Sequence, residues 1–199
     1  MLALAQPVEG KIVYTPAHEK FTWYPGLILD LAHDGTRDFR LALGSRAETG
    51  FRSGYAFVSG LGSGNGAIAT AKQNHSPAVA LPAGSRIGSG GLFDEGPFLV
   101  EEIYNYGKGF HSTVWNGQWG NGGKGLSNRY LGLKFIIKGK VHFGWARVTV
   151  KTDANNFTAI LTGYAYETVP NKAIIAGKTH GPDVIAEHGT LGELAAGSK

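Results

Sequence analysis

The sequence predicts an all-β protein with the architecture of an antiparallel, jelly-roll-like β-sandwich and glycine-rich loops. Glycine supplies 31 of the 199 residues, about twice the usual share, and shows no collagen-like period. Only 17% of the residues are charged, and the apolar residues fall into many short runs. The stretch 129–167 is dense in β-branched and aromatic residues, which are enriched in strands. A chain of this length fits one large sandwich domain.

The stretch 129–167 predicts a three-stranded antiparallel meander that forms the core sheet. Residues 138–140 and 153–156 contain the Gly, Asp and Asn that bound strands, and they divide the stretch into three runs. In the first run apolar and polar residues alternate, as in a strand with one buried and one wet face. The second run is apolar on both faces, which is typical of a central strand. We therefore expect this segment to be the scaffold and not the site.

The segments before the meander predict shorter strands joined by turns. The expected strands occupy residues 8–14, 27–31, 38–43 and 98–104. Asp34 and Gly35 stand between two of these runs, and Asp-Gly in that position is a strong signal for a β-hairpin. Residues 44–97 are rich in glycine and serine and contain only short apolar pieces, so we expect edge strands and connections there.

The Asp-Gly loop has a second interpretation, a calcium site. Residues 30–38 resemble the D-x-[DN]-x-D-G-x-x-D pattern of calcium loops, and Ca²⁺ prefers several oxygen ligands. Ala32 offers no side-chain oxygen at the third position, and Leu41 replaces the bidentate glutamate at the twelfth. A plain hairpin turn and a weak Ca²⁺ site therefore both fit, and no other cofactor is expected. The ligands would be the side chains of Asp30, Asp34 and Asp38 and the carbonyl group of Thr36.

No set of residues predicts catalysis, so we expect that the protein is not an enzyme. A glycosidase needs two carboxyl groups about 5 to 9.5 Å apart across a cleft. Glu101 and Glu102 are neighbours on an expected strand and therefore face opposite ways. We expect them to be solvated edge charges. The chain has no cysteine, and its seven histidines lack the spacing of a metal site.

Residues 109–125 combine aromatic side chains with asparagine and glycine. Aromatic rings on a loop can stack on sugar rings while the amides hydrogen-bond the sugar hydroxyl groups. The same side chains could instead cap the open end of the sandwich or pack against another subunit. The residues concerned are Phe110, His111, Trp115, Asn116, Trp119 and Asn121.

Charge and hydropathy exclude two kinds of partner. The net charge is +4, but the basic residues are scattered, so we expect no nucleic-acid binding. No apolar run reaches the roughly 18 residues of a membrane-spanning helix, so we expect no transmembrane segment. Residues 1–6 resemble the end of a signal peptide with an Ala-x-Ala-like site, which predicts export, although an arbitrary N-terminus is the alternative.

The sandwich is expected to span residues 7–168 and to be followed by an extended C-terminal arm, residues 169–199. The arm contains one short apolar run, Ala173, Ile174, Ile175 and Ala176. An apolar strand of this kind can add to the sheet edge of another copy. The run therefore predicts self-association through the arm.

Several segments together resemble one group of exported bacterial proteins. They are IVYTPAH (12–18), LDLAHDGTRDF (29–39), RYLGLKF (129–135), HFGWARV (142–148) and LTGYAYETVPNKAIIAGKT (161–179). The group is the PEP-CTERM proteins, whose chains end in a Pro-Glu-Pro sorting tail. Residues 190–198 resemble only a remnant of that tail. The resemblance implies export and a β fold, and it implies no activity.

From these observations we expect a non-catalytic extracellular structural protein that self-assembles into a filament or matrix. The alternative is a carbohydrate-binding or adhesive surface module that uses the loop of Trp115 and Trp119. In both cases the expected location is the exterior or the cell surface of a bacterium. The expected partners are copies of the chain or extracellular glycans.

Overall fold

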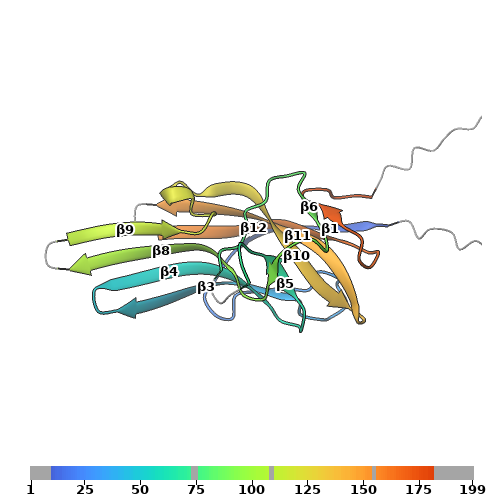
Figure 1. Ribbon diagram of the computed structural model, residues 1–199, viewed down its shortest axis with the longest axis horizontal. Helices are drawn as coiled ribbons and strands as arrows, with labels where there is room; N and C mark the ends of the chain where they lie inside the picture. Colours follow the sequence, from blue (N-terminus) through green and yellow to red (C-terminus); the bar gives the residue numbers. More distant parts are fainter. Residues whose placement is uncertain (1–9, 73–75, 108–109, 154–155, 182–199) are drawn as a thin grey trace, which may run out of the picture.

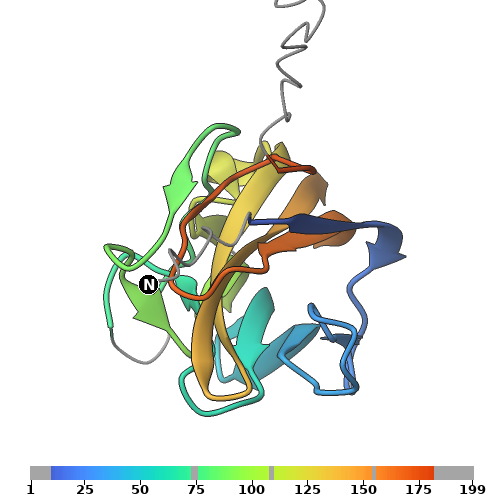
Figure 2. The same ribbon diagram turned by 90° about the vertical axis from the view of Figure 1, so that its right-hand side faces the viewer.

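Two antiparallel sheets pack against each other over a shared core (Figure 1). The computed structural model describes residues 10–72, 76–107, 110–153 and 156–181. Figure 2, viewed along the long axis, shows the two sheets as separate layers. Within the described residues the only helical segment is the three-residue 3₁₀ turn η1 (Asn121–Gly123), and no helix there is long and apolar enough to cross a membrane. The prediction of an all-β sandwich is confirmed.

The first sheet contains six strands in the order β1-β12-β11-β10-β5-β7. Their bounds are β1 (Ile12–Lys20), β5 (Gly66–Ile68), β7 (Phe93–Asp94), β10 (Leu126–Ile137), β11 (Lys140–Asp153) and β12 (Asn156–Glu167). The predicted meander is confirmed as β10, β11 and β12, with β11 in the middle. The β10–β11 hairpin turns at Lys138 and Gly139, whose φ angles of 48° and 77° match a two-residue type I′ turn.

The second sheet contains five strands in the order β2-β3-β4-β8-β9. Their bounds are β2 (Leu27–Leu29), β3 (Phe39–Glu48), β4 (Phe51–Gly60), β8 (Phe98–Gly107) and β9 (Phe110–Asn116). Asp34 and Gly35 connect β2 to β3, which pair antiparallel as the hairpin signal predicts. Since Leu29 pairs with Phe39, the connection is a longer loop than a two-residue turn.

The prediction for residues 44–97 is wrong in one respect. β4 lies between β3 and β8 in the middle of the second sheet and is not an edge strand. Its core-facing positions include Ala56 and Val58, which are both buried, but serine and glycine occupy several other positions. Glycine weakens a strand signal because it has no side chain to pack. β4 is instead stabilised by its backbone hydrogen bonds to β3 on one side and to β8 on the other.

The core has two parts, one on each side of the first sheet. Between the sheets, Phe39 packs with Leu133 and Val148, which come from β10 and β11. On the other side, Trp145 of β11 packs in a second cluster with Ile174. The central strand β11 is apolar on both faces because both faces are covered.

The predicted assembly strand is used within its own chain. β13 (Ile174–Ile175) pairs with β6 (Arg86–Ile87), and the Ala176 N–H group donates to the Ser85 carbonyl at 2.8 Å. Ile174 and Ala176 are buried and close the second core cluster. Burying a side chain such as Ile stabilises the fold by about 1.5–3 kcal/mol. One edge of the run Ala173–Ala176 is therefore already paired within the chain, and self-association through this run stays a prediction.

The first residues of the expected C-terminal arm belong to the sandwich. Lys172 Nζ lies 3.2 Å from Oε2 of Glu167, a buried carboxylate whose Oε1 accepts a 3.0 Å hydrogen bond from the Val169 N–H group. These bonds turn the chain back toward β6 directly after β12. Residues 182–199, and the expected signal-peptide remnant at residues 1–6, lie outside the described residues.

Candidate ligand-binding site

Residues of neighbouring strands line a pocket. Figure 1 shows the end of the molecule where β3, β8 and β11 finish, which is the end that carries these residues. Its volume is about 410 Å³. Most of its lining comes from β3, β4 and β8, and one residue comes from the start of β12. The lining residues are Ser45, Arg46, Ala47, Arg52, Ser53, Gly54, Glu102 and Asn156.

The pocket exists because the strands around it carry small side chains. Gly54 of β4 lies opposite Glu102 of β8 in the strand register. A Cβ atom at Gly54 would lie 3.7 Å from Cε1 of Phe157, which is an ordinary van der Waals distance. The glycine therefore leaves open a space that a side chain could fill. Ser45 and Ala47 on β3 leave further room beside it.

Glu102 is the buried carboxylate of this pocket. It is 5% exposed, and its Oε1 has no hydrogen-bond partner within the described residues. Burial raises the pKa of Glu102 because the charged form loses its hydration, whereas the charge of Arg52 acts in the opposite direction. Buried polar atoms are nearly always paired. Oε1 has less than 1 Å² of accessible surface, so a ligand can donate a hydrogen bond to it only after a small shift of the Glu102 side chain toward the pocket.

Arg52 brings a positive charge to the same lining. Its Cζ atom lies 5.0 Å from the centroid of the Tyr104 ring, in a cation–π contact. Tyr104 in turn stacks on His111, with ring centroids 5.8 Å apart, and its hydroxyl oxygen lies 2.9 Å from His111 Nδ1. Side chains of β4, β8 and β9 thus form one stack that supports the guanidinium group.

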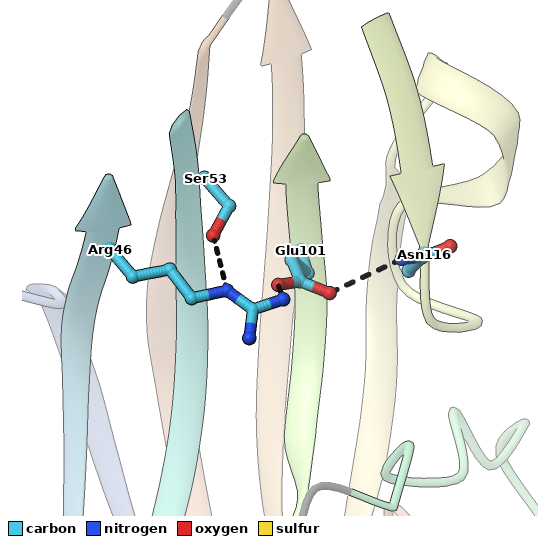
Figure 3. Close-up of polar contacts among 4 residues, drawn as sticks. All are labelled: Arg46, Ser53, Glu101 and Asn116. Carbon is cyan, nitrogen blue, oxygen red and sulfur yellow. Dashed lines mark hydrogen bonds and ion pairs between the residues drawn. The ribbon is translucent and has the colours of Figure 1, made fainter. Parts of the chain in front are cut away.

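A network of paired polar side chains crosses β3, β4, β8 and β9 (Figure 3). Arg46 Nη2 lies 3.2 Å from Glu101 Oε1, and Arg46 Nε donates to Ser53 Oγ at 3.3 Å. Asn116 Nδ2 donates to Glu101 Oε2 at 3.2 Å. Both carboxylate oxygens of Glu101 therefore have partners, in contrast to Glu102 beside it. The network joins β3, β4, β8 and β9, and the first three of these strands also line the pocket.

The predicted glycan contacts at residues 109–125 do not form one exposed surface. Trp119 is 0% exposed and belongs to the core between the sheets. A fully buried ring presents no face to a sugar, so the expectation is wrong for Trp119. Trp115 is half-buried and packs edge-on against Phe157, with ring centroids 6.4 Å apart. Aromatic rings contribute most when they are buried, and both tryptophans follow that tendency.

The polar residues of the same segment are bonded within the chain. Asn121 Nδ2 donates to the Gly125 carbonyl at 3.1 Å. The Asn116 amide is bonded to Glu101, and the His111 ring to the Tyr104 hydroxyl group. For Phe110 only the backbone, at the start of β9, is described. These contacts fit the alternative in which the loop caps the sandwich.

The acidic loop at residues 30–38 is built on its own hydrogen bonds. The Asp30 carboxylate accepts bonds from the N–H groups of Asp34 and Gly35, at 3.1 and 2.7 Å. Asp34 Oδ1 accepts one from the Thr36 N–H group at 2.9 Å. Hydrogen bonding to the Thr36 side chain, and then to its N–H group, lowers the pKa of Asp34. Such local bonds are typical of asparagine and aspartate turns.

Asp38 lies deeper than the other two carboxylates of the loop. It is buried, and its Oδ2 accepts a 2.8 Å bond from the Leu31 N–H group. Burial raises the pKa of Asp38 to about 6. Among the residues that the structure describes, no three acidic or histidine side chains are grouped to hold a metal ion. Ca²⁺ binding by this loop stays a prediction, which calorimetric titration with CaCl₂ tests.

Glu102 is the site residue that the sequence pattern did not reveal. The expectation that Glu101 and Glu102 face opposite ways agrees with their different partners, but the expectation of two solvated charges is wrong for Glu102. A usable signal was present, because Glu102 follows the apolar Val100 by two residues and so shares its face. The sequence could not show that β4 brings a glycine opposite Glu102.

No protein-family model matches the chain, and neither a curated protein nor a solved structure matches it. The function is therefore inferred from the pocket and its chemistry.

Proposed function

We propose that this protein is a non-catalytic binding module that holds a sugar residue of a glycan in the pocket at Glu102. The observation that carries the proposal is Oε1 of Glu102, a buried carboxylate oxygen of the pocket lining with no hydrogen-bond partner among the described residues. A sugar hydroxyl group can donate to this oxygen once the Glu102 side chain shifts toward the pocket. Such a hydrogen bond contributes about 0.5–1.5 kcal/mol, and more when the carboxyl group is charged.

The size and lining of the pocket support a polar ligand. Ligand pockets typically enclose about 300–1,000 Å³, and this one encloses about 410 Å³. Ser45, Arg52 and Asn156 add hydroxyl, guanidinium and amide groups to the carboxylate. An apolar ligand would leave these groups unpaired, which is unfavourable. Sugar hydroxyl groups both donate and accept hydrogen bonds, so they can bond to the hydroxyl, guanidinium, amide and carboxylate groups of the lining.

A binding role fits the pocket better than glycan hydrolysis. Glycosidases place two carboxyl groups on opposite sides of the scissile bond, about 5 to 9.5 Å apart. Among the described lining residues, Glu102 is the only carboxylate, and Glu101 is bound to Arg46 and Asn116. We therefore propose that the protein binds a glycan without hydrolysing it.

An exported protein at the cell surface of a bacterium would meet such glycans. This location rests on the N-terminal residues and on the resemblance to exported proteins. Fractionation of the bacterium that produces the protein, with detection by a specific antibody, would test it. Detection in the cytoplasmic fraction alone would contradict this part of the proposal.

The central experiment compares glycan binding by the wild-type protein and by Gly54→Val. The wild-type protein is expected to bind a subset of glycans on an array and to show saturable heat in calorimetry. Valine at position 54 fills the space beside Glu102, and its Cβ has ordinary distances to its neighbours. Binding is expected to fall by at least about tenfold, which corresponds to 1.4 kcal/mol.

A matched control is Gly96→Val, because a Cβ at Gly96 meets nothing within 4 Å. This variant is expected to bind as the wild-type protein does. Both variants should unfold at a temperature close to that of the wild type, so that lost binding is not lost folding. Glycan binding that survives Gly54→Val would remove the pocket as the site, and a protein that binds no glycan would remove the proposal itself.

A further inference from the structure

The guanidinium group of Arg52 is a charged group of the pocket that has no ion-pair partner among the residues that the structure describes. The described residues form two ion pairs, Arg46 with Glu101 and Lys172 with Glu167, and neither includes Arg52. Arg52 is exposed and rests on the Tyr104 ring at 5.0 Å. A cation–π contact orients the guanidinium group and leaves its N–H donors free for an acceptor.

Arg52 and Glu102 line the same pocket without bonding to each other. Gly54 lies opposite Glu102, and Arg52 precedes Gly54 by two residues, so the two charged residues are diagonal neighbours on one face of β4 and β8. Diagonal neighbours in an antiparallel pair are about 7–8 Å apart, with their Cβ atoms somewhat closer. Since no ion pair between described residues includes Arg52 and Oε1 of Glu102 has no partner among them, one ligand can bridge the donor fork on β4 and the carboxyl group on β8.

The charges of the lining indicate the charge of the ligand. Arg46 is neutralised by Glu101, so Arg52 and Glu102 are the unpaired charged groups. Burial disfavours the charged form of Glu102, whereas arginine stays charged at any ordinary pH. The exposed and always charged group of the pocket is therefore the positive guanidinium group of Arg52.

On this basis we propose that the ligand is an acidic sugar, whose carboxylate binds Arg52 while a hydroxyl group donates to Oε1 of Glu102. The inference rests on the proposed function and names the class of sugar. A planar guanidinium group bonds a planar carboxylate through two parallel N–H···O bonds. A phosphate group would bring nearly two negative charges next to Glu102, so a singly charged carboxylate fits the site better.

The test measures binding of trigalacturonate by calorimetry at low salt. The neutral comparison is the same trisaccharide with its carboxylates reduced to alcohols, and a sulfated trisaccharide is a third ligand. The wild-type protein is expected to bind trigalacturonate at least about tenfold more tightly than the reduced form, which corresponds to one charge-assisted bond.

Variants at the two charged residues separate their roles. Arg52→Gln is expected to reduce trigalacturonate binding at least about tenfold and to reduce binding of the reduced trisaccharide much less, because only the acidic form loses a charge-assisted bond. Glu102→Gln is expected to bind trigalacturonate at least as tightly as the wild type, because its amide oxygen still accepts the hydroxyl proton and the negative charge is gone. Arg86→Gln, an exposed arginine of β6, is the matched control and should change nothing.

The outcomes distinguish this inference from the proposed function. Equal binding of the acidic and the reduced trisaccharide, unchanged by Arg52→Gln, would overturn the inference and leave the sugar-binding proposal standing. Tighter binding of the sulfated trisaccharide would overturn the assignment of a carboxylate. Binding of none of the three, together with an array that shows no glycan, would overturn both.

Discussion

At the scale of single residues, Glu101 and Glu102 are adjacent in β8 and have opposite environments. Both oxygens of Glu101 are bonded, to Arg46 and Asn116. Oε1 of Glu102 is buried and unpartnered. The difference follows from the pleat of the strand, which directs successive side chains to opposite faces. One residue step therefore separates a structural ion pair from a buried carboxyl group whose Oε1 has no partner among the described residues.

Replacing each glutamate by glutamine should change stability in opposite directions. Burial raises the pKa of Glu102, so the folded protein holds a proton that the unfolded chain releases near the ordinary glutamate pKa of 4.5. The unfolding free energy therefore falls as pH rises from that value through the higher folded-state pKa. Glu102→Gln removes this loss and should be more stable than the wild type at pH 8, by on the order of 1 kcal/mol.

Glu101→Gln is the matched comparison for the same measurement. It weakens the ion pair with Arg46 and should lower the unfolding free energy by about 0–1 kcal/mol, as for other partly exposed pairs. Chemical denaturation at pH 4 and pH 8 gives both values. A Glu102→Gln protein that is less stable than the wild type at pH 8 would show that Glu102 has a stabilising partner in solution.

Trp119 is a second residue whose role follows from burial. Trp119→Ala should lower the unfolding free energy by about 3–5 kcal/mol, because it removes a fully buried ring from the core. Trp119→Phe should cost much less, since Nε1 has no hydrogen-bond partner among the described residues and most of the apolar volume is kept. Thermal unfolding measures both variants. Similar melting temperatures for Trp119→Ala and the wild type would mean that this ring is exposed.

At the scale of elements, the two-residue strand β13 helps to cover the outer face of the first sheet. It pairs with β6, and the pair lies over the side of the first sheet that the second sheet does not cover. In Figure 1, β6 lies toward the end of the molecule opposite the pocket. The segment after β12 therefore completes the second core cluster and leaves the pocket untouched.

The two isoleucines of β13 provide an internal comparison. Ile174 is 1% exposed and Ile175 is 37% exposed. Ile174→Ala should lower the unfolding free energy by about 2–5 kcal/mol, whereas Ile175→Ala should lower it by less than about 1 kcal/mol. Urea denaturation of the two variants distinguishes them. Equal effects would mean that β13 is not packed on the first sheet.

At the scale of the whole molecule, the same pairing bears on self-assembly. The expectation of a filament or matrix depended on the run Ala173–Ala176 adding to another copy, and this run is paired with β6. We therefore expect single particles in negative-stain electron microscopy and a monomer mass in light scattering at micromolar protein. Filaments that persist in an Ile175→Lys variant would restore assembly by another surface. Filaments lost in that variant would show that β13 does exchange between copies.

Much of the fold could be predicted from local pattern. Alternation and turn residues predicted the meander β10–β11–β12 and its central strand, and Asp34-Gly35 predicted the pairing of β2 with β3. β4 was not recognised as a central strand, because its glycine and serine residues carry little apolar pattern. Of the candidate site, the opposite orientation of Glu101 and Glu102 was predictable, whereas the pocket was not.

The sequence by itself determined the class of the fold, because strand periodicity is a property of consecutive residues. It determined which residues share a face, and so it separated Glu101 from Glu102. Only the tertiary structure decided which of these faces meets a second layer. Burial of Trp119, the glycine opposite Glu102 and the pairing of β13 with β6 all depend on segments distant in sequence. The pocket is therefore a product of packing, since it lies where small side chains from separate strands leave space around one buried carboxylate.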